Sequence, residues 1–233
     1  METNKELTYA EKLRPLIADL LKADQSGHDA LHVYRVEVLA ADFARSEGAD
    51  EELTRCIALL HDCDDYKLFG MEAAENLNNT RRIMKEADLP QNMQEAILEA
   101  IGTIGYSKRL KGITPKTLEA ICVSDADMCD ALGANGIIRS YQYALSKGNE
   151  LFDPDLWPRV DLSAKEYQTK QKDTVVNHCF EKLLKLQGMM LSNSGRAEAL
   201  NRHAFIVLFL RNLFMEERNT AWLNYLNEYL KGL

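Results

Sequence analysis

The sequence predicts an all-α fold, a helical bundle with a C-terminal helical subregion. Apolar residues recur with helical spacing along most of the 233 residues, and no run alternates apolar and polar residues as a half-buried strand would. The hydrophobic content of 46% is enough for a core, and 27% charged residues is ordinary for a globular protein. No internal repeat or low-complexity tract interrupts the pattern. We therefore expect one helical domain over residues 1–233.

The N-terminal half contains most of the expected helices. Gly48 is the expected C-terminal stop of the second helix, and Asp50 is the expected N-cap of the third. Thr114 followed by Pro115 is the usual order at the start of a helix. The expected helices cover about 5–24, 28–47, 50–61, 71–87, 91–105 and 115–132.

The C-terminal half is divided by one long segment without periodicity. Residues 148–163 contain two prolines and are predicted to form a loop or flap. Gly133 and Gly136 are expected to loosen the turn that leads into the helix at about 137–147. The expected helices cover about 137–147, 164–190 and 195–231. Within the single domain we expect a core over about 25–147, the flap, and C-terminal helices over 164–231.

The charge and the cysteines narrow the class of protein. A formal net charge of −8 argues against a nucleic-acid binder, although a cleft can still hold a small anionic substrate. The sequence contains no apolar run of the roughly 20 residues that a membrane helix needs, and its start has no signal-peptide pattern. Five cysteines without a CxxC pair are typical of reduced core thiols. We expect a cytoplasmic protein; a homodimer is one possible assembly.

A histidine-bearing face is expected on the second helix. His28 and His32 are four residues apart in GHDALHVYRV and therefore share a face, and Arg35 lies three residues further along. An ordinary structural role is the alternative, in which His28 caps the helix and His32 packs in the core.

A second signal is the pair His61-Asp62, at the end of the apolar run CIALL. Adjacent residues on a helix diverge by about 100°, so the two side chains can reach one ion from both flanks of the helix. Imidazole together with carboxylate suits Mn²⁺, Fe²⁺, Zn²⁺ or Ni²⁺ better than Ca²⁺. A bound cation would compensate the desolvation of both groups.

Further carboxylates lie in VSDADMCDALGANGIIRS, residues 123–140. Asp125, Asp127 and Asp130 interrupt a mostly apolar helix, and Asp127 and Asp130 share one face. Carboxylates in such a helix need partners, of which a metal ion is one. Helix caps and solvent-facing acids are the alternative.

The order His32, His61-Asp62, Asp127 resembles the H…HD…D signature of the HD-domain metal-dependent phosphohydrolases. The wording HVYRV, ALLHDCDDYK and DADMCDALGANGIIRS is similar to that of the small stand-alone bacterial HD hydrolases. HCFEKLLKL and RAEALNRHAFIVLFLRNLFMEE resemble the C-terminal helices of the same subfamily. The likeness covers most of residues 25–217, and it implies an all-α bundle with a metal ion between helices.

The resemblance implies that His32, His61, Asp62 and Asp127 are the metal ligands. His32 is preferred to His28 because the family's first ligand is the histidine directly before an xxRV run. Asp127 is preferred to Asp125 because the family's last ligand is the aspartate within an ADxx(D/S)A-like run. His28 would then lie one turn away, within reach of substrate.

The chain departs from the family's multi-metal members, because it has no histidine between residues 62 and 178. We therefore expect one divalent ion per chain, namely Mn, Fe, Ni, Zn or Co, with Mg as a further option. Cleavage of cyclic-nucleotide or cyclic-dinucleotide messengers becomes less expected for the same reason.

The candidates for contact with a phosphorylated substrate are His28, Arg35, Lys67 and Arg139. Of these, Arg35 and Lys67 are the cations expected to stabilise charge on the phosphoryl oxygens. Asp65 is expected to accept the proton of the attacking water or to hold Lys67. A surface salt bridge between Asp65 and Lys67 is the alternative. Near the flap, His178, Arg196, Arg202 and His203 are candidates to line a closed cleft.

Together with the resemblance, these residues predict a metal-dependent phosphohydrolase that acts on phosphate ester or anhydride bonds. The resemblance implies nucleotides as the substrate class, and the sequence shows no base-recognition motif of its own. A non-catalytic HD module that senses metal and nucleotide is the first alternative. It is less favoured because all four ligands are present and no output domain is visible. An HD oxygenase ranks last, since its two-iron site would need more histidines.

Overall fold

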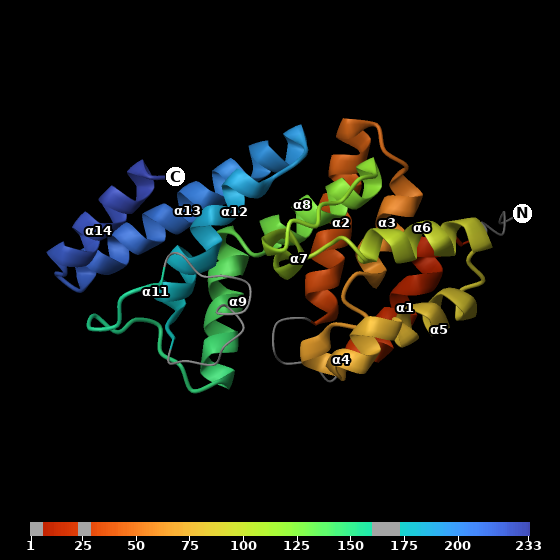
Figure 1. Ribbon diagram of the computed structural model, residues 1–233, viewed down its shortest axis with the longest axis horizontal. Coiled ribbons are helices and arrows are strands. Elements are labelled where there is room, and N and C mark those ends of the chain that lie inside the picture. Colours follow the sequence, from red (N-terminus) through yellow and green to blue (C-terminus); the bar gives the residue numbers. More distant parts are fainter. Residues whose placement is uncertain (1–6, 23–28, 160–172) are drawn as a thin grey trace, which may run out of the picture. The chain divides into compact units, whose positions relative to one another are not determined.

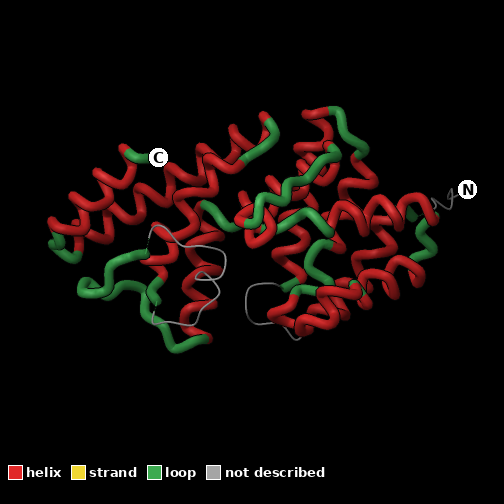
Figure 2. Tube along the Cα trace, in the orientation of Figure 1, coloured by secondary structure: helices red, strands yellow, loops and turns green. Residues whose placement is uncertain are grey.

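The computed structural model describes residues 7–22, 29–159 and 173–233. Within these ranges every named element is helical, and the single β feature is an isolated bridge between Glu150 and Thr174. Figures 1 and 2 show helices joined by loops throughout the described residues. The predicted all-α fold class is confirmed.

The chain divides into two compact units, residues 1–126 and residues 127–233. The boundary falls inside one continuous helix, α8 (Leu118–Asp130). The expectation of a single domain over residues 1–233 therefore stays a prediction.

The first unit is built around α3. This helix packs against α1, α2 and α6, and its residues Cys56 to Leu60 are almost completely buried. Leu13 and Ile17 of α1 and Ile97 of α6 have no exposed surface. The helices of this unit before α8 are α1 (Tyr9–Leu21), α2 (Ala30–Glu47), α3 (Glu51–Leu60), α4 (Tyr66–Asn76), α5 (Asn78–Glu86), α6 (Gln91–Ile101) and α7 (Tyr106–Leu110).

The stop and start signals around α2 and α3 act as the sequence predicts. Gly48 ends α2 in the left-handed conformation, with φ of 80°, and its N–H reaches the Ala44 carbonyl. The Asp50 carboxylate accepts a hydrogen bond from Leu53 N and so caps α3. Asp29 caps α2 in the same way, through His32 N. Short connections of this kind hold the ends of α2 and α3 in a defined geometry.

Two expected helices of this unit are broken. The range 71–87 is not one helix, because Leu77 adopts a left-handed conformation between α4 and α5, and Gly70 kinks α4 at a φ of 84°. The range 91–105 ends at Ile101, and a separate short helix, α7, follows Gly105, which has a φ of 120°. Apolar periodicity continues across these breaks, and for that reason it did not reveal them.

The second unit is organised around the long helix α13, which packs against α9 and α14 (Figure 1). Its core contains a cluster of rings in which Phe180, Phe214 and Trp222 are buried. The elements after α8 are α9 (Gly133–Ser146), α11 (Val175–His178), a π-helical turn (Cys179–Leu183), α12 (Leu184–Leu186), a 3₁₀ turn (Gln187–Met189), α13 (Asn193–Glu216) and α14 (Thr220–Lys231).

The expected helix 195–231 is in fact two helices. Arg218 adopts a left-handed conformation with φ of 53°, and the Asn219 side chain caps α14 by accepting from Trp222 N. This break lets α14 fold back along α13, so that Trp222 is fully buried. The expected helix 137–147 begins earlier, at Gly133. Of the expected helix 164–190, residues 164–172 lie outside the described residues, and the helical part begins at Val175.

The proline-bearing segment is non-helical as far as residue 159, as predicted, and residues 160–163 lie outside the described part. Trp157 stacks on Trp222 with ring centroids 4.5 Å apart, and the Trp222 indole N–H donates to the Pro154 carbonyl at 3.0 Å. The described half of this segment is therefore anchored on the aromatic core of its own unit. Its proposed role as a flap stays a prediction.

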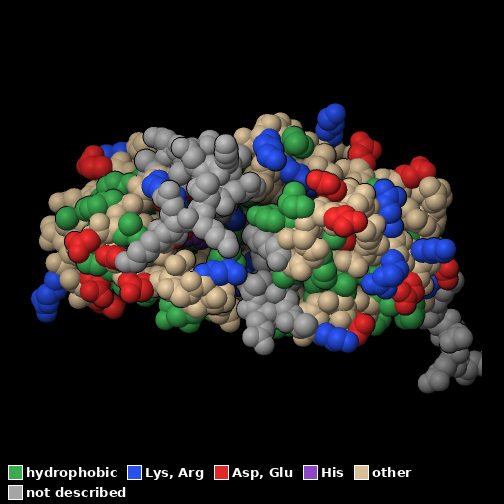
Figure 3. All heavy atoms as spheres, turned by 60° about the horizontal axis from the view of Figure 1, so that its bottom comes forward, with side chains coloured by type: hydrophobic (Ala, Val, Ile, Leu, Met, Phe, Trp, Pro, Cys, Tyr) green, Lys and Arg blue, Asp and Glu red, His purple; other side chains and the backbone are tan. Residues whose placement is uncertain are grey.

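The five cysteines are all free and buried, as the sequence predicts. Burial raises the pKa of the Cys122 and Cys179 thiols to about 12, so both stay protonated near neutral pH. Among the described residues no helix is both long enough and apolar enough to cross a membrane. Basic and acidic side chains are interspersed on the face shown in Figure 3.

Candidate metal centre

His61 lies at the C-terminal end of α3, where its ring is held by the backbone. Its Nδ1 atom is 2.7 Å from the Ala58 carbonyl oxygen. Because a carbonyl oxygen only accepts hydrogen bonds, this contact assigns the ring hydrogen to Nδ1. In the neutral ring the lone pair is then on Nε2, which is the arrangement of a metal-binding histidine with a supporting carbonyl.

His32 lies in the first turn of α2 and has no exposed side-chain surface. The close packing of α2 on α3 brings its ring edge-on to His61, with ring centroids 5.4 Å apart and an interplanar angle of 71°. Two imidazoles therefore meet inside the first unit, although 29 positions of sequence separate His32 from His61.

Asp62 follows His61 in the turn after α3, and its carboxylate faces both rings. Its Oδ2 is 3.3 Å from His32 Nε2, and its Oδ1 is 3.5 Å from His61 Nε2. In the tautomer assigned above, His61 Nε2 presents a lone pair to this anionic oxygen, which is repulsive unless a proton or a cation lies between them. A divalent cation bound by both groups would remove the repulsion.

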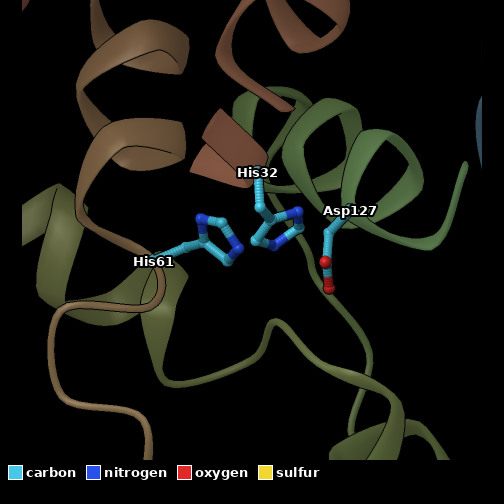
Figure 4. A group of neighbouring side chains, drawn as sticks. All are labelled: His32, His61 and Asp127. Carbon is cyan, nitrogen blue, oxygen red and sulfur yellow. The ribbon is translucent and has the colours of Figure 1, made fainter. Parts of the chain in front are cut away.

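Asp127 provides a second carboxylate from α8. It is one residue beyond the boundary between the two units, on a helix that is continuous across that boundary. One ligand atom from each of His32, His61 and Asp127 lies within 4.8 Å of the others, and Figure 4 shows the three side chains converging. The three belong to three different helices or helix ends.

The donor set fits a divalent transition metal. Two imidazole nitrogens and nearby carboxylate oxygens, partly or fully withdrawn from water, suit Mn²⁺, Fe²⁺, Co²⁺, Ni²⁺ or Zn²⁺. The structure thus groups His32, His61 and Asp127 and places Asp62 against both histidines. It does not identify the ion.

Asp64 has a structural role that the sequence did not reveal. Its side chain is buried and accepts hydrogen bonds from Thr80 N and Thr80 Oγ1, both at 2.8 Å, and from Asn79 N at 2.9 Å. These donors lie in the first turn of α5, where amide groups have no partner within the helix. Asp64 therefore ties the turn after α3 to the start of α5.

Asp65 shapes the same turn through its backbone. Its N–H donates to the Asp62 carbonyl at 3.2 Å, and its own carbonyl accepts from Leu68 N and Phe69 N at 3.0 Å. The side chain of Asp65 is partly exposed. Its proposed part in proton transfer stays a prediction.

Beyond Asp127, the end of α8 is held by ionic contacts inside the second unit. Asp130 is 1% exposed and forms an ion pair with Arg139 at 2.6 Å. Arg202 of α13 donates to the Cys129 carbonyl at 2.8 Å and to Glu198 at 2.6 Å. The guanidinium groups of Arg139 and Arg202 therefore contact protein acceptors, and contact of Arg139 with substrate stays a prediction.

Lys108 of α7 is a cation that the sequence-based prediction did not consider. Its Nζ donates to the Ile101 carbonyl at 2.5 Å. Burial lowers the pKa of the ammonium group, whereas the negative charge of Asp62 acts to raise it. The run IGYSKRL showed a lysine and an arginine, but nothing in its periodicity indicated that the lysine would donate to the last carbonyl of α6.

The remaining candidates are only partly described. Arg35 is partly buried on α2, one turn after His32. His28 lies outside the described residues, and the side chain of Lys67 is likewise not described. Arg196 is exposed and bonds to Asn193, His178 is partly exposed, and burial lowers the pKa of His203. None of these contacts tests a role in substrate binding.

The helical fold and this H…HD…D grouping are those of an HD domain, and the HD-domain family model matches residues 30–132. Together with the relatives described next, this match shows that the chain belongs to the HD-domain family.

YpgQ of Bacillus subtilis, an uncharacterized protein, is 30% identical over 210 residues, which cover 90% of this chain and 94% of YpgQ. A crystal structure of YpgQ in complex with ADP superposes with a TM-score of 0.67 at 26% identity, over 91% of this chain and 99% of that one.

Two further crystal structures are similar. A Lactobacillus plantarum protein has a TM-score of 0.79 at 31% identity, over 94% of this chain and 99% of that chain. An HD-superfamily hydrolase from Bacillus thuringiensis has a TM-score of 0.68 at 31% identity, over 91% of this chain and 97% of that chain. The likeness extends well beyond residues 30–132 and includes the C-terminal helices.

Proposed function

We propose that this protein is a metal-dependent phosphohydrolase that cleaves phosphate ester or anhydride bonds of nucleotides. The observation that carries the proposal is the convergence of His32, His61 and Asp127 within 4.8 Å, with the Asp62 carboxylate against both rings. A partly buried group of this composition is suited to a divalent ion, and membership of the HD-domain family agrees with hydrolysis.

The proposed ligands are His32, His61, Asp62 and Asp127. A divalent ion held by these four residues would supply Lewis acidity, which would polarise a phosphoryl oxygen and make bound water more acidic. The Ala58 carbonyl keeps His61 in the tautomer that offers Nε2, and the packing of α2 on α3 positions His32. These contacts preorganise the donors before a ligand arrives.

Two further residues have proposed roles with the substrate. Arg35 lies one turn from His32, and its guanidinium can donate two parallel hydrogen bonds to a phosphate. Asp65, in the turn that carries Asp62, is the proposed acceptor for a proton of the attacking water.

Nucleotides are proposed as the substrate class because YpgQ has been crystallised with ADP. That ligand belongs to YpgQ, which shares 26% identity with this chain in the structural comparison. The two chains align over almost their full lengths, so a nucleotide-sized ligand is a reasonable first choice here.

The test is a hydrolysis screen with metal analysis on the same protein. Protein purified without chelator is expected to contain about one transition-metal ion per chain. With added Mn²⁺ it should release phosphate or pyrophosphate from at least one nucleoside mono-, di- or triphosphate. Tight nucleotide binding without release of either product would contradict the proposal and would favour the non-catalytic sensor. Two tightly held ions per chain would contradict the prediction of a single ion but would leave the proposed hydrolysis standing.

A further inference from the structure

Helix α13 has one apolar face that packs inside its own unit. Its residues Ala199, Ile206, Leu210 and Phe214 have at most 1% exposed surface and recur at helical spacing. The helix packs against α9, α12 and α14. In a helix that only covers this core, the opposite side would be polar.

The opposite side of α13 is also largely apolar. Its large side chains Leu200, Phe205, Leu208 and Met215 are between 45% and 63% exposed. The exposed residues along the middle of this side follow one another in alternating steps of four and three: Ala197, Asn201, Ala204, Leu208, Arg211 and Met215. This spacing repeats every seven residues, which is the pattern of a helix that pairs with another helix. We call these six residues the outer face of α13.

The outer face is complementary to a second copy of itself when the two helices run antiparallel and a two-fold axis passes level with Ile206. In this register Ala204 lies opposite Leu208 of the second copy. Likewise, Ala197 lies opposite Met215 of the second copy. Each large side chain then meets a small one, so the two helix axes can approach closely. Four of the six positions therefore form apolar pairs that are matched in size.

The two polar positions of the outer face match in the same register. Asn201 lies opposite Arg211 of the second copy, and its amide oxygen can accept a hydrogen bond from that guanidinium group. A parallel pair would instead place every residue opposite its own counterpart. Two Arg211 cations would then face each other, which is repulsive, and pairs of alanines would leave gaps. Charge and size therefore both favour the antiparallel arrangement.

We propose that two copies of this chain associate through the outer face of α13, as an antiparallel helix pair with two-fold symmetry. This interaction surface lies entirely in the second unit, and it depends neither on the proposed function nor on a metal ion. From Ala197 to Met215 the face is about 27 Å long, which is short for a standard interface of about 800 Å² per partner. We therefore expect a dissociation constant in the micromolar range.

Sedimentation equilibrium of the full-length protein, at concentrations from ~1 to ~200 µM, tests the proposal. The wild type should change from one chain to two chains per particle across this range. Leu208→Glu should weaken the association by roughly a hundredfold or more, because each copy would bury a carboxylate in the helix pair. Leu145→Glu is the matched control, since Leu145 on α9 of the same unit is 56% exposed and Leu208 is 57% exposed. This control should associate as the wild type does.

Cysteine cross-linking tests the orientation of the two helices. The five native cysteines are all buried, so they should contribute little background. Under mild oxidation, a chain that carries both Ala197→Cys and Met215→Cys should form disulfide-linked dimers, because these positions lie opposite each other in the antiparallel pair. Each single variant should stay unlinked, since its cysteine would be about 27 Å from its own counterpart. Linkage of a single variant as complete as that of the double variant would show a parallel pair and would overturn the proposal.

The other outcomes of sedimentation are equally decisive. A wild type that remains a single chain at every concentration overturns the proposal, and so does a Leu208→Glu variant that dimerises as the wild type does. Loss of the dimer in Leu145→Glu would move the interface to α9 and would also overturn it. Circular dichroism checks that Leu208→Glu keeps its helical content. If this variant does not fold, the cross-linking result decides by itself.

Discussion

At two places in the molecule, acids that lie close together in the sequence have different partners. In the turn after α3, Asp62 faces two histidine rings, whereas Asp64 accepts hydrogen bonds from the first turn of α5. At the end of α8, Asp127 belongs to the candidate metal group, whereas Asp130 pairs with Arg139. In each case a carboxylate two or three residues from the candidate ligand stabilises the fold instead.

The difference lies in the partners that packing supplies. Asp64 meets two backbone amides and a hydroxyl, which satisfy it without an ion. Asp62 instead meets ring nitrogens, one of which presents a lone pair in the tautomer set by Ala58. Burial alone does not identify a ligand, because Asp64 and Asp130 are more deeply buried than Asp62.

The largest effect should come from the proposed ligands. His61→Ala or Asp62→Ala should remove the metal ion and lower phosphate release by roughly a thousandfold or more, because the Lewis acidity is lost with the ion. Metal content by elemental analysis and product release measure the two effects. His28→Ala should keep the ion. If His28→Ala loses the ion and His32→Ala retains it, the ligand assignment on α2 is reversed.

A chelator provides an independent check of whether Asp62 holds a metal ion. An ion that binds only the folded state raises the melting temperature, so EDTA should lower the Tm of the wild type. It should leave the Tm of Asp62→Ala unchanged. A chelator-dependent change in Asp62→Ala as large as in the wild type would show that Asp62 is not needed to hold the ion.

Asp64→Ala should mainly reduce stability. The substitution leaves the amides of Asn79 and Thr80 and the Thr80 hydroxyl without their acceptor, which should lower the free energy of unfolding by roughly 3–5 kcal/mol. Urea denaturation measures the loss. Turnover per bound metal should stay close to normal at a temperature where the variant is folded. A folded Asp64→Ala protein that no longer binds metal would place Asp64 among the ligands.

The smallest effect should come from the ion pair between Asp130 and Arg139 at the end of α8. Arg139→Met removes the cation that faces the buried Asp130 carboxylate and should cost about 2–4 kcal/mol of unfolding free energy. Asp130→Asn with Arg139→Met should recover part of this loss, as a double-mutant cycle would show. The sequence-based alternative is that Arg139 binds substrate. In that case Arg139→Lys would lower kcat/KM and leave stability unchanged.

Much of the helical framework could be predicted from local patterns. Gly48 and Asp50 have their effect within one turn of the backbone, so the end of α2 and the start of α3 follow from the residues there. Leu77 and Arg218 are different, because each adopts a left-handed conformation that its residue type does not favour. Apolar periodicity gave no sign of those two breaks.

The sequence indicated which side chains would come together at the candidate site, but not what surrounds them. His32, His61-Asp62 and Asp127 stand in an order that resembles the HD family, and the structure groups both histidines with Asp127. The hydrogen bond from Lys108 to the end of α6 depends on where α7 lies after α6, which no local spacing encodes.

The sequence by itself determined the helical class, the caps around α2 and α3, the reduced cysteines and the residue types of the candidate metal group. Each of these depends on a short range of residues or on composition. Only the tertiary structure decided which acids meet histidines and which meet amides or arginine. The physical reason is that the energy of a carboxylate or an ammonium group is set by the groups that packing places within a few ångströms, and those groups come from distant parts of the chain.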